Sequence, residues 1–305
     1  MPRPREAAVE RAPGATLGEW VRSVQRRLGD AGIADAGREA RRLVAQVAGV
    51  APEAVIGRPE MPLDAVCQAA IEAAVAKRIE GMPVGRIVGE RAFYGRDFRL
   101  NEATLEPRAD SETVIDAVLE IVAKTGLGDR PLRIIDVGTG TGCLLVTLLA
   151  ELPLAAGLGT DLAPRALVAA WANAERHGVV GRADFAISDA LEEVSGRFDI
   201  LVSNPPYIRS DEIAGLDAEV RFHDPLLALD GGPDGLDVYR RIAGRLATVV
   251  PKGWAFFEIG AGMREAVCAV IKETTGPQAD WRVWHDLNGI ERCVACQALF
   301  PRLRE

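Results

Sequence analysis

The sequence lacks the features of membrane-spanning, secreted and broadly nucleic-acid-binding proteins. No apolar run approaches the roughly 20 residues that a membrane-spanning helix needs. The five cysteines are scattered and odd in number, which fits a reducing compartment better than a disulfide framework. Because the net charge is -8 and the sequence pI about 5.2, we expect no broad basic face for nucleic acid. The opening residues, MPRPREAAVERAPG, contain no apolar signal-peptide core, so we expect a cytoplasmic protein with a disordered leader over residues 1–14.

The spacing of a metal site is also missing. Cys293 and Cys296 form a C-x-x-C pair, but no second Cys or His pair lies at the spacing of a zinc site. We interpret both as small apolar residues of a strand and predict no metal site. His223 lies beside Asp224 in a predicted loop, and we do not assign it as a catalytic base.

The most informative stretch that is present covers residues 198–208 and reads FDILVSNPPYI. Its first five residues are short and nearly all apolar, which predicts a buried parallel strand. Pro205 and Pro206 have no N–H to donate to a ladder, so the chain must leave the sheet there. Ligands of open α/β sheets bind at the carboxyl edge of the strands, and this stretch therefore predicts a binding site.

The residues beside the prolines suit one kind of ligand. The side-chain oxygen of Asn204 and a nearby main-chain carbonyl can together accept both hydrogens of a planar NH2 group. Tyr207 can stack on the plane of that group. The alternative interpretation is a proline-rich turn after a core strand.

A second motif, RIIDVGTGTGC, covers residues 133–143. It predicts a strand over 133–137, a glycine-rich turn and an apolar helix over 144–150. The three alternating glycines let a ligand approach the main chain closely, and the helix start supplies unpaired N–H groups. Cys143 stands where a dinucleotide fingerprint has its third glycine, and no Lys-Ser/Thr pair follows, which excludes a Walker-type phosphate loop.

Two acids follow the next predicted strands. Asp161 ends a strand over 157–161, where a carboxylate can accept hydrogens from two ribose hydroxyls. Asp189 follows a strand over 183–187 and is predicted to accept from an adenine amino group. Either acid alone could instead cap a helix. Their serial placement at strand ends favours a ligand.

The 305 residues are enough for two domains, and the N-terminal part reads differently from the rest. Apolar residues at helical spacing predict helices over 17–28, 38–50 and 63–79. No catalytic constellation occurs among them. We interpret this part as a small helical bundle for recognition or support, and leave open whether its arginines contact a partner or face solvent.

Residues 81–112 predict a junction and the start of a helix. Two short runs, 88–94 and 98–100, flank Gly95-Arg96-Asp97, which is typical of a hairpin. A helix over 113–122 follows, with Ser111 or Asp110 as its cap. For Arg108, ligand binding and support of the helix start stay open.

The last third of the chain predicts a lid and the end of a sheet. The long acidic loop after Tyr207 has the length of a lid over the site. Helices are predicted over 236–250 and 263–273, with a strand over 253–259 between them. Glu258 lies inside that strand's apolar run, and its carboxylate needs a partner that the sequence does not name. Residues 281–286 and 293–300 predict a closing antiparallel pair.

Together these motifs resemble a class I S-adenosylmethionine-dependent methyltransferase. The resemblance depends on DVGTGTG, on Asp161 and on NPPY at 204–207, a motif that recurs in enzymes that methylate a planar or conjugated nitrogen. Three further segments, PVGRIVGERAFYGRDF, LEPRADSE and VRFHDPLLALDGGPDGLDVYRRI, resemble the HemK family of release factor N5-glutamine methyltransferases. Two residues of LEPRADSE depart from that family's pattern, since Ala109 stands for a proline and Ser111 for a threonine.

The resemblance implies an α/β fold with a Rossmann-like seven-stranded sheet, an antiparallel last strand and a small N-terminal helical bundle. The implied domains are a helical substrate-recognition domain over 15–82, a β-hairpin linker over 83–105 and an S-adenosylmethionine-dependent methyltransferase domain over 106–305. At the position of Ala190 family members often have an aromatic residue, so stacking on adenine is not expected from this residue.

The resemblance also implies roles for individual residues. The residues implied to bind S-adenosylmethionine are Gly138, Thr139, Gly140, Thr141, Gly142, Asp161, Asp189, Ala190 and Asn204. The residues implied to bind the substrate are Asn204, Pro205, Pro206, Tyr207 and Arg108, of which Asn204, Pro205 and Tyr207 are assigned to catalysis.

The implied reaction is methylation of the side-chain amide N5 of the glutamine in the GGQ motif of peptide chain release factors. A ribosomal protein is an alternative substrate for the same chemistry. An adenine-N6 nucleic-acid methyltransferase is a further alternative, because a flipped adenine also offers a conjugated NH2 group. The acidic net charge speaks against it, and we expect no stable nucleic-acid binding, no membrane association and a monomer.

Overall fold

The computed structural model describes residues 16–275 and 280–297, and the chain divides into two compact units, Met1–Val88 and Gly89–Glu305. The predicted leader over 1–14 and the end of the strand predicted to reach residue 300 lie outside the described residues. In the described part of the chain, no helix combines the length and the apolar character needed to cross a membrane.

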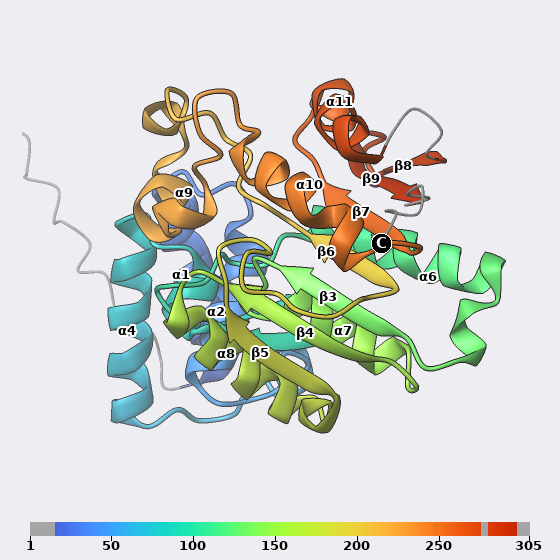
Figure 1. Ribbon diagram of the computed structural model, residues 1–305. Helices are drawn as coiled ribbons and strands as arrows, with labels where there is room; N and C mark the ends of the chain where they lie inside the picture. The colour runs from blue at the N-terminus through green and yellow to red at the C-terminus, as the bar shows by residue number, and fades with distance from the viewer. Residues whose placement is uncertain (1–15, 276–279, 298–305) are drawn as a thin grey trace, which may run out of the picture. The chain divides into compact units, whose positions relative to one another are not determined.

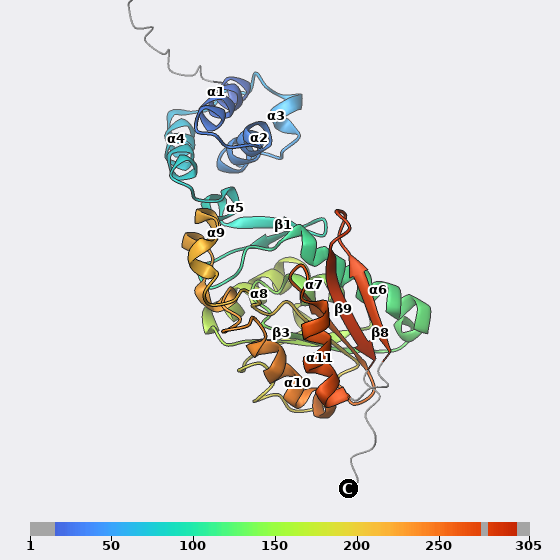
Figure 2. The ribbon, with the colours of Figure 1, turned by 90° about the horizontal axis from the view of Figure 1, so that it is seen from above.

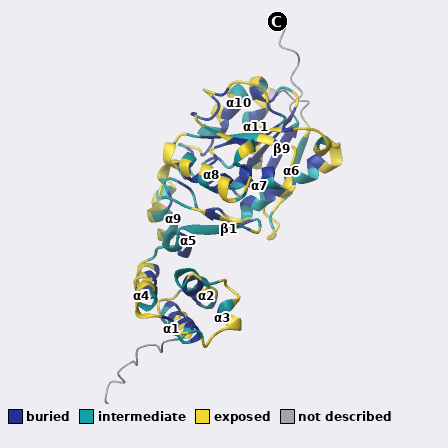
Figure 3. Ribbon diagram, turned by 90° about the horizontal axis from the view of Figure 1, so that it is seen from below, coloured by how far each residue is buried: buried dark blue, intermediate teal, exposed yellow. Residues whose placement is uncertain are grey.

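The first unit is helical, as its apolar spacing predicts. Its helices are α1 (Leu17–Asp30), α2 (Ala36–Val47), α3 (Ala54–Gly57), α4 (Ala65–Ile79) and α5 (Val84–Val88). Residues at helical spacing form a shared core, and Figure 3 shows the buried sides of α1 and α2 in dark blue. The three longer predicted helices are confirmed. The short helix α5 differs from the prediction, because residues 83–105 are predicted as a hairpin linker.

The second unit begins with a hairpin of β1 (Glu90–Phe93) and β2 (Arg96–Arg99). The predicted hairpin is confirmed, but its turn is Tyr94-Gly95 and not Gly95-Arg96-Asp97, because Phe93 pairs directly with Arg96. Both turn residues have positive φ, 49° and 71°, as a two-residue hairpin turn requires. Glu112 accepts the Tyr94 N–H at 2.7 Å, and Asp116 accepts its hydroxyl at 2.9 Å, which holds this unusual conformation.

A mixed sheet forms the centre of the second unit. Its strands are β3 (Arg133–Val137), β4 (Ala156–Asp161), β5 (Ala183–Ile187), β6 (Ile200–Ser203), β7 (Trp254–Glu258), β8 (Trp281–His285) and β9 (Glu291–Gln297). The 7-stranded sheet has the order β5-β4-β3-β6-β7-β9-β8, and β9 is antiparallel to both of its neighbours. The predicted α/β fold with a Rossmann-like sheet is therefore confirmed, including its antiparallel strand.

Helices cover both faces of the sheet, as Figure 1 shows. One face packs against α6 (Glu112–Thr125), α7 (Cys143–Glu151) and α8 (Pro164–Arg176). The other packs against α10 (Asp237–Val249) and α11 (Arg264–Thr275). Strand residues alternate between the two cores, so Ile134 and Phe256 face α6 and α7 while Ile135 and Phe257 face α10.

The same alternation explains the C-x-x-C pair. Cys293 and Cys296 are both fully buried in β9, which confirms the strand interpretation. Being three positions apart, they belong to opposite cores of the sheet. Two thiols on opposite faces do not converge on one metal ion.

Loops at the carboxyl ends of the strands position the site. β3, β4, β6 and β7, labelled in Figure 1, run parallel, so the residues that follow them meet at one edge of the sheet. Figure 2 shows α6 and α11 on opposite sides of β8 and β9. We call residues 208–230 the lid segment; it contains the short helix α9 (Ala218–His223). The 3-10 turns of the unit are η1 (Ala109–Ser111), η2 (Leu127–Asp129), η3 (Val180–Arg182), η4 (Ile213–Gly215) and η5 (Leu226–Ala228).

Candidate active site

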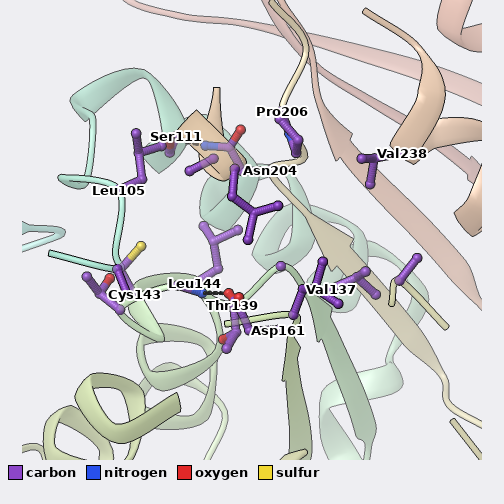
Figure 4. Close-up of a pocket in the computed structure, with 18 of the residues that line it drawn as sticks. Leu105, Ser111, Val137, Thr139, Cys143, Leu144, Asp161, Asn204, Pro206 and Val238 are labelled. Atoms are coloured by element: carbon purple, nitrogen blue, oxygen red, sulfur yellow. Dashed lines mark hydrogen bonds between the residues drawn. The ribbon is translucent and has the colours of Figure 1, made fainter. Parts of the chain in front are cut away.

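A pocket opens at this edge, and most of the predicted site residues line it. Figure 4 shows Asn204 and Ser111 together at one end, and Thr139 and Asp161 together at the other. We call these the amide end and the carboxylate end. Residues 103–108 and the lid segment supply apolar walls between the two ends, including Leu105 and Leu227.

The glycine turn forms the main-chain wall of the carboxylate end. Gly140 has a φ of 55°, a conformation that a residue with a side chain rarely adopts. Its N–H donates to Asp161 Oδ2 at 2.9 Å, and the Thr139 N–H donates to the Thr160 carbonyl at 2.8 Å. A Cβ added at Gly142 would lie 3.2 Å from the Ala170 Cβ, so this glycine also lets α7 approach α8 closely. The turn is thereby held against β4 with its backbone along the pocket.

Asp161 is fixed by the main chain with its carboxylate at the pocket. In addition to the Gly140 bond, its Oδ1 accepts the Ala163 N–H at 2.9 Å. Burial raises the pKa of Asp161, and the backbone donors oppose that rise. Each carboxylate oxygen has a second lone pair and can accept one more hydrogen. A pair of neighbouring hydroxyls on a ligand can use both.

Asp136 fixes the glycine turn through hydrogen bonds from its buried carboxyl. It is 1% exposed, and its Oδ2 accepts the Thr139 hydroxyl at 2.7 Å and the Leu145 N–H at 3.3 Å. Burial raises its pKa to about 7. Because both donors belong to the turn and to the first residues of α7, this carboxyl fixes the geometry of the loop.

Asp189 and Ala190 line the pocket beside β5, where the sequence placed them. Both oxygens of Asp189 already accept from the Arg241 guanidinium, at 2.9 and 3.1 Å. Ala190 is buried with a φ of 50°, and it presents only a methyl side chain. The predicted contact of Asp189 with an adenine amino group stays a prediction.

The amide end is built on the last residues of β6. The Ser203 hydroxyl donates to the Val137 carbonyl at 2.7 Å, which fixes the strand end against β3. The next residue, Asn204, donates from Nδ2 to the Ser111 hydroxyl oxygen at 3.2 Å. Of the two predicted caps of α6, Ser111 does occupy the N-cap position, and Asp110 does not. In the described chain the Ser111 hydroxyl makes no capping bond, and Asp110 pairs with Arg292 at 3.0 Å.

Glu258, the buried acid without a named partner, lies beside this amide. It is 3% exposed at the end of β7. Burial raises its pKa to about 7, and hydrogen bonding with the side chains of Ser111 and Asn204 opposes the rise, as does the charge of Arg292. Among the described residues, its Oε2 has no hydrogen-bond partner.

The other residues of the proline motif lie differently. Pro206 lines the pocket, while Pro205 is buried beside it. Tyr207 packs against the core on the α10 side, and a Cβ added at Gly260 would lie 3.0 Å from its ring. Pro205, Tyr207 and Gly142 are not among the residues that line the pocket, so their predicted roles stay predictions.

Arg108 lines the pocket and connects it to the lid segment. Its guanidinium donates to Asp224 at 2.6 Å, and the side chain of Asp224 is only 4% exposed. Asp224 also accepts the Glu106 N–H at 3.4 Å, and the Glu106 carboxylate pairs with Arg91 at 3.0 Å. These contacts attach the lid segment to the strand-like stretch before α6.

The sequence reasoning missed several pocket residues. Arg241, the partner of Asp189, lies on a helix with no local motif, and only its pairing in the fold reveals it. Leu105, Leu162 and Val238 are isolated apolar residues whose positions around the pocket depend on the tertiary fold. Glu258 did carry a signal, because an acid inside an apolar strand run is costly unless it has a partner.

Two family models match the chain. The family described as "PrmC N-terminal domain" matches residues 19–89, and the family described as "Methyltransferase small domain" matches residues 110–222. The second range contains the glycine turn, Asp161 and Asn204. The chain therefore matches known families in both of its units.

Similar proteins with curated names cover nearly the full length. The release factor glutamine methyltransferase of Cereibacter sphaeroides is 44% identical over 278 residues, which is 91% of this chain and 96% of the relative. That of Agrobacterium fabrum is 44% identical over 260 residues, 84% of this chain and 89% of the relative. Among solved structures, the hMettl16 catalytic domain in complex with MAT2A 3'UTR hairpin 6 is similar with a TM-score of 0.54 and 16% identity, covering 76% of this chain and 84% of that one. This last likeness concerns the fold alone.

Proposed function

The chain belongs to the family of release factor glutamine methyltransferases, and from this premise we propose its reaction. It methylates the side-chain amide N5 of the glutamine in the GGQ motif of peptide chain release factors. The methyl donor is S-adenosylmethionine. As a member of this family the chain is a protein-glutamine methyltransferase. The observation that carries the detailed proposal is one pocket with a fixed carboxylate at one end and an amide acceptor at the other.

The carboxylate end fits S-adenosylmethionine. The open lone pairs of Asp161 suit the two ribose hydroxyls, and the glycine turn over 138–142 leaves room for a ligand along its backbone. We place the adenine between Ala190 and the side chain of Asp189. When it is bound, this donor supplies a methyl group that its sulfonium already activates strongly.

The amide end then has to position a poor nucleophile. The lone pair of a glutamine amide nitrogen is delocalised into its carbonyl. In our proposal the Asn204 side-chain oxygen and the Pro205 carbonyl accept its two N–H hydrogens and orient the nitrogen. Both acceptors also stabilise the positive charge that develops on nitrogen during transfer. The products are N5-methylglutamine and S-adenosylhomocysteine, and the released proton passes to water.

The remaining predicted residues have places in the same proposal. Tyr207 stacks on the plane of the substrate amide, and Pro206 forms the adjoining wall. Arg108 contacts the substrate main chain near the lid segment. The helical unit over residues 16–88 recognises another part of the release factor.

Transfer of labelled methyl from S-adenosylmethionine to a purified release factor tests this function. The control substrate is the same release factor with its GGQ glutamine replaced by alanine. We expect label on the first and none on the second. Equal label on both would contradict the assignment of the methylated residue, and label on neither, with S-adenosylmethionine bound, would contradict the assigned substrate.

A further inference from the structure

The orientation of the Asn204 side-chain amide is set by the groups that surround it. An asparagine side chain can turn over and exchange its oxygen and nitrogen with little change of shape. In one orientation Oδ1 faces the pocket and can accept from the substrate; in the other the NH2 group faces the pocket and opposes another donor. Neighbouring groups therefore decide whether this residue accepts or repels the substrate amide.

The fold places a buried carboxyl next to this amide. β6 and β7 are parallel, and Ser203 is paired with Phe257. Asn204, the residue after β6, and Glu258, the last residue of β7, therefore come next along the two neighbouring segments. Side chains alternate along a strand, and Glu258 therefore faces the same side as Trp254 and Phe256. That side is the one covered by α6, whose first turn follows Ser111.

A hydrogen bond joins Asn204 and Ser111 next to the Glu258 carboxyl. Asn204 Nδ2 donates to the Ser111 oxygen at 3.2 Å. Ser111 is 2% exposed, so its own hydrogen must go to a nearby acceptor, and the Glu258 carboxylate is available as one. The carbonyl-type oxygen of a carboxyl accepts in both protonation states, so Glu258 can take a hydrogen from Ser111 or from Asn204 Nδ2.

We propose that Glu258 is a positioning residue that, together with Ser111, holds Nδ2 of Asn204 on the α6 side and leaves Oδ1 free to face the pocket. This inference rests on the proposed function of Asn204 as acceptor of the substrate amide. It explains why an acid occupies the end of an otherwise apolar strand, where an unpaired carboxyl is costly. Glu258 acts through Asn204 and is not assigned any contact with the substrate.

Glu258→Gln is the direct test, because glutamine keeps the size of the side chain but can donate to Asn204 Oδ1. A turned amide would then present its NH2 group to the substrate NH2. We expect kcat for methyl transfer to the release factor to fall about 10- to 100-fold. The dissociation constant for S-adenosylmethionine should stay within about twofold, because the carboxylate end is unchanged.

A matched control and a second pair of variants complete the design. Glu291→Gln removes a carboxylate from the neighbouring strand β9, where it pairs with Arg264, and should leave kcat unchanged. Ser111→Ala removes an acceptor of the Asn204 amide and should lower kcat about threefold to tenfold, while Ser111→Thr, which keeps the hydroxyl, should restore it.

The outcomes distinguish failure of the positioning role of Glu258 from failure of the proposed methyltransferase function. If the wild-type protein transfers no methyl group to release factor, the proposed function fails. If the wild type is active and Glu258→Gln has the same kcat, the positioning role is wrong. If Glu258→Gln does not fold, as judged by loss of S-adenosylmethionine binding, the Ser111 pair decides, and equal kcat for Ser111→Ala and wild type overturns the inference.

Discussion

The two ends of the pocket are built in different ways. At the carboxylate end, main-chain groups hold the working side chain, since Gly140 and Ala163 donate their N–H groups to Asp161. At the amide end a side chain holds a side chain, since the Ser111 hydroxyl accepts from Asn204 Nδ2, and we propose that Glu258 supports the same orientation. A site fixed by backbone tolerates many neighbouring substitutions, whereas a site fixed by side chains depends on each of them. Substitutions at the amide end should therefore lower kcat, whereas substitutions at the carboxylate end should weaken the binding of S-adenosylmethionine.

Asn204→Ala should have the largest effect, because it removes an acceptor that orients the nucleophile and stabilises its developing charge. We expect kcat to fall about 100- to 1000-fold with little change in affinity for S-adenosylmethionine. Calorimetric titration and a labelled-methyl assay measure the two quantities. Asn288→Ala, in an exposed turn before β9, is the control. An equal loss of cofactor affinity would contradict the role given to Asn204.

Asp161→Ala should have the next largest effect, and this effect should be on the affinity for S-adenosylmethionine. Loss of two charge-assisted hydrogen bonds to ribose should raise the dissociation constant for S-adenosylmethionine about 10- to 100-fold. At saturating cofactor, most of the kcat should return. Asp184→Ala removes an exposed acid from β5 and serves as the control. A variant that binds cofactor normally would show that Asp161 does not contact it.

Asp224→Asn tests how the lid segment is attached beside the pocket through Arg108. It weakens the 2.6 Å ion pair with Arg108 that attaches the lid segment. Because the pair is half exposed on the Arg108 side, we expect only a threefold to tenfold rise in KM for release factor, with kcat nearly constant. Asp211→Asn disrupts an exposed pair in the same segment and should change neither value. A large fall in kcat would place Asp224 closer to the chemistry than we propose.

The smallest effect concerns stability and pH. Burial raises the pKa of Glu258 from 4.5 to about 7, so the folded state keeps a proton that the unfolded chain loses between these values. The favourable contribution of the neutral carboxyl is complete below about pH 4.5 and is lost as the pH rises through about 7. Glu258→Gln should therefore raise Tm by about 2–4 °C at about pH 8.5, with a smaller gain at about pH 6.

Thermal unfolding at both pH values, with Glu291→Gln as the reference variant, measures this effect. A fall in Tm of equal size at both pH values would show that the Glu258 carboxyl stabilises the fold in its ionised form. A gain at high pH together with the lower kcat expected above would mean that this residue serves activity at the expense of stability.

The carboxylate end could be predicted almost entirely from the sequence. The glycine turn and Asp161 follow predicted strands directly, and the carboxyl ends of parallel strands meet at one edge. The sheet itself follows from short apolar runs separated by helical patterns. Two local misses have separate causes. Helix α5 lies in a stretch predicted as a linker, and the hairpin turn uses Tyr94, whose φ of 49° is not one that the residue type signals.

The amide end could be predicted only in part. Asn204 is evident from its motif, but its partner Ser111 lies 93 residues away and was interpreted as a helix cap. No local pattern relates these residues, because their contact depends on the packing of α6 over the ends of β6 and β7. Glu258 could be recognised as a buried acid, and only the strand register reveals which side chain it faces.

The most direct test of two separate ends is a double-variant cycle of Asn204→Ala and Asp161→Ala. The quantity is the single-turnover rate of methyl transfer to release factor at a subsaturating concentration of S-adenosylmethionine. If one end positions the substrate and the other binds the cofactor, the two free-energy losses add within about 0.5 kcal/mol. A double variant that is no slower than Asn204→Ala alone would contradict this division of the pocket.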